Sequence, residues 1–208
     1  PGCLSALAYQ SKPLAHWISL PVTSPHTLNS IANDGTGLRL QLHWEQDRYH
    51  HHIDWISGDL VTRLLESTEI AAEDSSAQRP VFQQVSVESR GLESQVALAV
   101  GMGGQSHWSM SVETVPASRT LVFDVACRVT TPFEGLASCY QLLAPVSSVE
   151  SRKCEFNVMG HPCRVEVDLS AKSEKLRLEL SQNQLQLTVE PLDQEVPRTV
   201  RWRYRVIG

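Results

Sequence analysis

The stretch from residue 37 to residue 56 has the clearest alternation of apolar and polar side chains in the chain. Each half of it places its apolar residues at every second position, with a polar break between the halves. The apolar-side positions are Leu38, Leu40, Leu42 and Trp44, followed by Tyr49, His51, Ile53 and Trp55. Because side chains alternate across a strand, this pattern predicts a β-hairpin with one buried face.

The register of this hairpin decides which polar side chains meet. A turn at residues 46–47 pairs Glu45 with Arg48 and brings both apolar sets onto one face, whereas a slip by one residue would separate them. The polar face then follows without further choice. It pairs His43 with His50, Gln41 with His52, and Arg39 with Asp54.

Three imidazoles, those of His43, His50 and His52, therefore converge on the polar face. Opposite Cβ atoms lie about 5 Å apart, so the ring nitrogens can reach one zinc ion at about 2.1 Å and leave a position for water. Metal-bound water is a hydrolytic nucleophile. The pattern predicts a transition-metal site, and the alternative is a solvated face without a cofactor. His51 points to the apolar face, where we expect a hydrogen-bonded core histidine.

Alternation and turn signals divide the rest of the chain into strands and loops. The strands are expected at 16–22, 60–67, 81–89, 95–102, 105–129 (a hairpin), 138–143, 153–158, 163–169, 175–180, 185–190 and 199–207. The loops are expected at 23–36, 71–79, 130–137 and 145–152. The segment 95–102 is more uniformly apolar, which predicts a strand covered on both faces.

Hairpin after hairpin with almost no helical periodicity predicts an all-β fold. The expected architecture is a large antiparallel two-sheet β-sandwich of about 12–14 strands. We expect one domain over residues 1–208. The alternatives are two smaller sandwiches, divided near residues 71–80 by an acidic, serine-bearing linker, or a barrel.

A second polar cluster is predicted on the hairpin 105–129. Pairing Glu113 with Val122 buries its apolar residues and places His107 opposite Arg128 and Ser111 opposite Asp124. A histidine, carboxylates and an arginine could form an acid–base cluster. The alternative is an ordinary exposed ladder of ion pairs.

The last strand presents a comb of Arg201, Arg203 and Arg205 opposite its apolar face. Guanidinium groups bind carboxylates or phosphates bidentately, so the comb is a candidate ligand grip. The alternative is that it pairs with acidic rows on neighbouring strands. Those rows are Glu166 and Asp168, or Glu179.

The five cysteines are odd in number and match no zinc motif. They are Cys3, Cys127, Cys139, Cys154 and Cys163. In the hairpin that contains the last two, burial of Phe156 against Val165 places Cys154 opposite Val167. That register excludes a disulfide with Cys163, and we expect free, mostly buried thiols.

Composition limits the function classes. The chain has 208 residues, 41% of them hydrophobic, with a net charge of −5, so it can build a core and is not expected to bind nucleic acid. No apolar run approaches the about 20 residues that span a bilayer. Four tryptophans fall on apolar faces and are expected in the core, which leaves Trp17 as the one free to stack on a sugar. The four are Trp44, Trp55, Trp108 and Trp202.

The favoured function is a non-catalytic binding or interaction domain, with a carbohydrate, a small anionic ligand, another small molecule or a protein as partner. The candidate ligand-binding residues are His107, Asp124, Arg128, Arg201, Arg203 and Arg205. One alternative is a metal-binding protein or metal-dependent hydrolase that uses the three-histidine cluster. The other is a structural domain of a larger assembly, which predicts an exposed apolar patch or edge strand.

Overall fold

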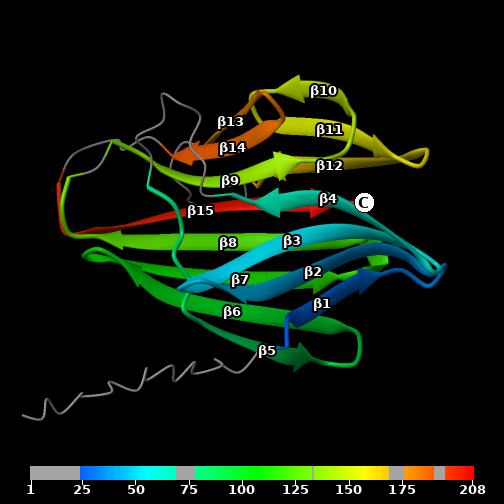
Figure 1. Cartoon of the computed structure of the whole chain (residues 1–208), viewed down its shortest axis with the longest axis horizontal. Coiled ribbons are helices and arrows are strands. Elements are labelled where there is room, and N and C mark those ends of the chain that lie inside the picture. Colours follow the sequence, from blue (N-terminus) through cyan, green and yellow to red (C-terminus); the bar gives the residue numbers. More distant parts are fainter. Residues whose placement is uncertain (1–23, 69–77, 133, 169–175, 190–194) are drawn as a thin grey trace, which may run out of the picture.

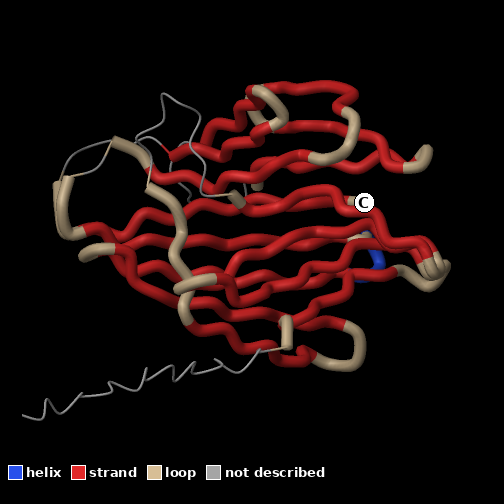
Figure 2. Tube along the Cα trace, viewed as in Figure 1, coloured by secondary structure: helices blue, strands red, loops and turns tan. Residues whose placement is uncertain are grey.

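The computed structural model describes residues 24–68, 78–132, 134–168, 176–189 and 195–208. In these ranges the chain folds into antiparallel strands and one 3-10 turn, η1 (Pro116–Ser118). The strands form two sheets and run along the long axis of the molecule (Figure 1). Short turns join most of them at their ends (Figure 2). The predicted all-β sandwich is confirmed, with two antiparallel sheets of seven and eight strands.

The seven-stranded sheet has the order β1-β2-β3-β4-β9-β14-β13. Its strands are β1 (His26–Ile31), β2 (Thr36–Glu45), β3 (Arg48–Ser57), β4 (Leu60–Ser67), β9 (Leu136–Leu142), β13 (Leu176–Ser181) and β14 (Gln184–Val189). Strands on both sides of residues 71–80 share this sheet, because β4 pairs with β9.

The eight-stranded sheet has the order β10-β11-β12-β15-β8-β7-β6-β5. Its strands are β5 (Gln84–Arg90), β6 (Ser94–Gly103), β7 (Ser106–Val115), β8 (Thr120–Val129), β10 (Val146–Glu150), β11 (Lys153–Val158), β12 (His161–Val167) and β15 (Arg198–Ile207). Within the described ranges, no helix has the length and apolar character needed to cross a bilayer.

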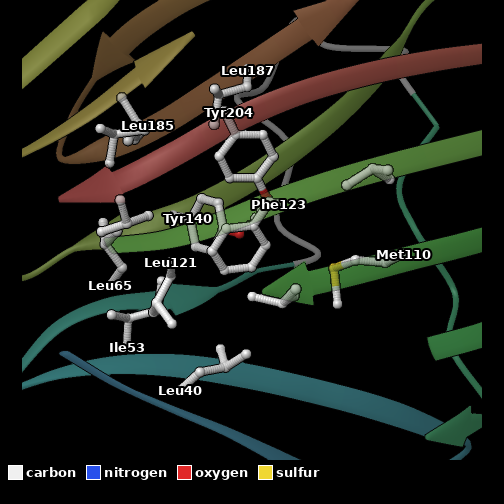
Figure 3. Packing of buried hydrophobic residues seen from close by; sticks show 14 of the residues in the cluster. Leu40, Ile53, Leu65, Met110, Leu121, Phe123, Tyr140, Leu185, Leu187 and Tyr204 are labelled. Carbon is white, nitrogen blue, oxygen red and sulfur yellow. Dashed lines mark hydrogen bonds between the residues drawn. The ribbon is translucent and has the colours of Figure 1, made fainter. Parts of the chain in front are cut away.

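The core lies between the inner faces of the two sheets. Figure 3 shows side chains from both sheets meeting there, among them Leu40 and Ile53 from one and Phe123 and Tyr204 from the other. Phe123 stacks on Tyr204, with ring centroids 4.8 Å apart. Burial of each large apolar side chain stabilises the fold by about 1.5–3 kcal/mol.

The register predicted for the hairpin β2–β3 is confirmed at every pair, including His43 with His50. Its turn forms although Gln46 must take a positive φ of 56°. The register of β7–β8 is also as predicted, with Glu113 opposite Val122. The leucine pairs of β13–β14 match the prediction too. In all three hairpins two apolar sets face the same core, which excludes a register shifted by one residue.

Two strands lie where loops were expected. In β1 only Leu28 and Ser30 are buried, so the segment lacks an apolar stripe, and the Ser30 hydroxyl instead donates to the Thr120 carbonyl at 2.8 Å. In β10 no residue is buried. Both are edge strands held by main-chain pairing, which leaves little trace in side-chain alternation. The strand predicted at 16–22 lies outside the described residues.

The predicted register of β11–β12 was wrong by two residues. Cys154 pairs with Val165, not Val167, because the turn uses only Met159 and Gly160. Both turn residues have positive φ, as in the tight two-residue turns that suit twisted strands. A shift of two keeps the buried face, so both cysteines remain buried and free. Cys127 and Cys139 are free as well, and Cys3 lies outside the described residues.

Two burial predictions were also wrong. The strand β6 is covered on one face only, and Val100 and Met102 are 46% and 48% exposed. Trp44 is 38% exposed, since it lies beyond the end of the neighbouring β1, and its ring contacts Tyr49 edge-on. The other three tryptophans expected in the core are buried there. Trp17 lies outside the described residues.

Candidate functional site

The three histidines of the predicted zinc site do meet on the outer face of the seven-stranded sheet. The ring centroid of His43 lies 6.2 Å from that of His50 and 5.4 Å from that of His52. Their proximity follows directly from the strand register, since two of them alternate on β3 and the third faces them from β2.

The nitrogens of this cluster are engaged in ways that do not resemble a metal site. Nε2 of His52 lies 2.7 Å from Nη2 of Arg63 and 2.9 Å from Oε1 of Gln41. A guanidinium can only donate and an amide oxygen can only accept, so Nε2 either accepts from Arg63 or, when it carries a proton, donates to Gln41. In both cases this nitrogen is engaged within the protein. Burial lowers the pKa of His52, although nearby Asp54 opposes the shift.

Among the described residues, no group of three or more histidine, cysteine or acidic side chains is arranged to hold a metal ion. Nδ1 of His43 and Nδ1 of His52 have no hydrogen-bond partner in the described part of the chain, but a third ligand does not join them. The zinc site therefore stays a prediction of the sequence that the side-chain geometry does not support.

His51 points the other way, into the core, as expected. Its Nε2 lies 2.9 Å from the hydroxyl of Tyr140, which lies 2.6 Å from the hydroxyl of Tyr204. Burial lowers the pKa of His51 to about 3 and raises that of Tyr204 to about 12. Burial also raises the pKa of Tyr140. At neutral pH these three side chains are therefore uncharged, which suits hydrogen bonding within the core rather than proton transfer.

The arginine comb of β15 is on the outer face of the eight-stranded sheet and is paired with carboxylates. Arg201 donates from Nε to Oδ1 of Asp124 at 2.6 Å. Nη2 of Arg205 lies 2.9 Å from Oδ2 of the buried Asp168, and Nε of Arg203 lies 3.3 Å from the same oxygen. The predicted pairing with the row of Glu166 and Asp168 is therefore present, since Oε1 of Glu166 also lies 3.8 Å from Nη1 of Arg205. Glu179 is on the other sheet, 3.5 Å from Arg177.

His107 and Arg128 differ from the comb. They lie opposite each other on β7 and β8, as predicted, and neither forms an ion pair or a side-chain hydrogen bond within the described ranges. Asp124, the nearby carboxylate of the predicted cluster, is committed to Arg201. Of the six candidate residues, this pair remains available to a ligand.

A hollow of about 560 Å³ opens beside this pair, and we call it the β6–β8 trough. Its lining includes Val100 and Met102 from β6, and Ser109 from β7. None of its lining residues is acidic. The sequence reasoning missed the apolar wall because it treated β6 as covered on both faces. The alternation of Val100 and Met102 with Gly101 could have shown that both lie on one face.

Comparison with known proteins assigns no relatives. No protein-family model matches the chain, and no curated protein matches it either.

Proposed function

We propose that this protein is a non-catalytic binding domain that holds a small anion with an apolar part in the β6–β8 trough. The observation that carries the proposal is the unpaired His107 and Arg128 at one end of a hollow walled by exposed Val100 and Met102. A guanidinium is the preferred protein group for carboxylates and phosphates.

Charge supports an anionic ligand. The trough lining contains no carboxylate to neutralise Arg128, whereas the neighbouring arginines of β15 each have one. Charge-assisted hydrogen bonds are stronger than neutral ones, so an anion at Arg128 gains more than a neutral polar group.

Size and polarity support an amphipathic ligand. A hollow of about 560 Å³ lies within the range of small-molecule sites. Its lining includes Trp108, which is buried, so none of the described lining residues offers an exposed indole or phenol ring for stacking on a sugar. An alkyl or aryl body against Val100 and Met102 fits this wall better than a glycan does.

The test is calorimetric titration with octyl phosphate, octanoate and the neutral octyl glucoside, with methyl NMR shifts of Val100 and Met102 to locate binding. We expect the two anions to bind and the glucoside to bind far more weakly. Arg128→Gln should weaken anion binding about tenfold or more, since a hydrogen bond to a charged group is worth about 1.5–3 kcal/mol.

Arg201→Gln is the matched control, because Arg201 is also exposed on this face but is paired with Asp124. It should leave affinity within about twofold. Equal binding of the glucoside, or an Arg128→Gln variant that binds like the unaltered protein, would contradict the proposal.

A further inference from the structure

A second site is suggested by an opening in the seven-stranded sheet. The strand β4 pairs with β3 from His52 onward and then ends at Ser67. The last bond to β3 is made by a side chain, with the amide of His51 donating to Oγ of Ser67 at 2.9 Å. Because β4 ends here, it does not fill the space between the start of β3 and the start of β9.

The segment 78–83, which we call the crossing segment, passes over this opening. It is bonded to both sides, because the amide of Tyr49 donates to the Phe82 carbonyl at 2.7 Å and that of Ala137 donates to the Gln78 carbonyl at 2.9 Å. The amide of Gln83 then reaches the Val100 carbonyl on the other sheet, at 2.8 Å. The main chain therefore holds the cover of the opening at three points.

A pocket of about 40 Å³ lies beneath the crossing segment. Its inner lining includes the hydroxyl-bearing rings of Tyr140 and Tyr204, together with Met110, all of which appear in Figure 3. Phe82 adds a buried apolar wall. The space suits a small group that is polar at one end and apolar at the other.

The outer lining carries basic residues. It contains Arg48, Arg79 and His50, and none of the lining residues is acidic. Arg48 is paired with Asp47, Nε to Oδ1 at 2.8 Å. Arg79 has no such partner in the described part of the chain: its Nε donates to Sγ of Cys139 at 3.3 Å, and sulfur is a weak acceptor.

The decisive atom is Nη2 of Arg79, which is buried and has no hydrogen-bond acceptor among the described residues. A buried donor left without an acceptor is costly, and more so on a charged group. A carboxylate in the pocket would supply the missing acceptor.

We propose that this pocket binds the carboxylate of a small monocarboxylic acid, with its oxygens at Arg79 and its short apolar end toward Phe82 and Met110. The planar guanidinium matches a carboxylate in geometry. The small volume favours a short acid over a larger tetrahedral phosphate ester. The pocket has no lining residue in common with the β6–β8 trough, and the proposal does not depend on the function proposed there.

The test is NMR titration with propionate, its neutral isostere propionamide, and inorganic phosphate, followed at the rings of Tyr140 and Tyr204 and the methyl of Met110. We expect saturable shifts with propionate and about tenfold weaker binding of propionamide. This comparison needs no variant. Shifts that are equal for the acid and the amide, tighter binding of phosphate, or no saturable shift at these residues would each overturn the proposal.

Variants locate the charge. Arg79→Gln should lose propionate binding about tenfold or more, and Arg79→Lys should keep part of it, because a lysine retains charge but not the bidentate geometry. Arg63→Gln is the control on the same sheet, outside the pocket lining. Binding by Arg79→Gln that equals that of the unaltered protein would overturn the assignment. If Arg79→Gln does not fold, Arg79→Lys and the propionamide comparison still decide.

Discussion

The outer faces of the two sheets use basic side chains in different ways. On the seven-stranded sheet Arg63 pairs with the buried Asp54 and also contacts Nε2 of His52, so these basic side chains are engaged with neighbours on the same face. On the eight-stranded sheet the comb of β15 is paired, but His107 on β7 and Arg128 on β8 have no partner among the described residues. Strand register decides which side chains meet, and the supply of carboxylates decides which of them remain open to a ligand.

The largest expected effect is a pH dependence of folding stability, and it comes from His51. This residue is buried between the sheets, whereas its neighbours on β3 face outward. Its folded-state pKa of about 3 lies below that of the unfolded chain, about 6.5. The unfolded state therefore binds the proton first, so stability present above pH 6.5 is lost as pH falls toward 3. We expect the free energy of unfolding to fall by about 1.4 kcal/mol per pH unit below pH 6.

Urea unfolding measured from pH 7 to pH 4.5 checks this dependence. The variant His51→Gln should show a shallower pH dependence whatever its own stability. An unchanged slope in that variant would mean that His51 does not carry the effect.

The next effect compares the carboxylates of the two faces. Asp54 is almost fully buried and accepts from Nε of Arg63 at 3.1 Å, so Asp54→Asn should destabilise the fold by about 1–3 kcal/mol. Asp124 pairs with the well-exposed Arg201, and Asp124→Asn should cost less than about 1 kcal/mol. Equal losses in the free energy of urea unfolding for the two variants would show that burial does not set the contribution of each ion pair.

Zinc affinity tests whether the histidines of the seven-stranded sheet are open to a ligand. Because Arg63 occupies Nε2 of His52, we expect protein purified without nickel resin to carry well under one zinc per chain. Arg63→Gln removes this donor and should raise zinc affinity, as measured by competition with a chromogenic chelator. Stoichiometric zinc in the unaltered protein would instead establish the three-histidine site.

The smallest effect on stability is expected at the wall of the β6–β8 trough. Met102 is exposed, so Met102→Gln should change the free energy of unfolding by no more than about 0.5 kcal/mol. The same variant should weaken octanoate binding severalfold, since it removes apolar contact with the ligand. Unchanged octanoate affinity in this variant would show that the ligand does not contact Met102.

Elements with two matched apolar sets could be read from the sequence. In the hairpins β2–β3 and β7–β8 the register that places the apolar residues directly opposite one another was predicted, and the structure has that register. The β11–β12 hairpin shows the limit of this reasoning. A shift of two residues buries the same face, so alternation could not choose between a two-residue and a four-residue turn, and the wrong partner was assigned to Cys154.

Local pattern determined most of the strands, most of the buried faces and which rows of charged residues stand side by side, because alternation with a period of two fixes both faces of a strand once one is buried. The tertiary structure alone decided which charges are neutralised and where the sheet opens. The buried Nη2 of Arg79 lies in a pocket only because segment 78–83 crosses between β9 and β6. Its main chain is bonded to Tyr49, about 33 residues before its partner, and to Val100 and Ala137, about 17 and 59 residues after theirs. Contacts of that kind are made between residues distant in sequence, so no window of the sequence contains them.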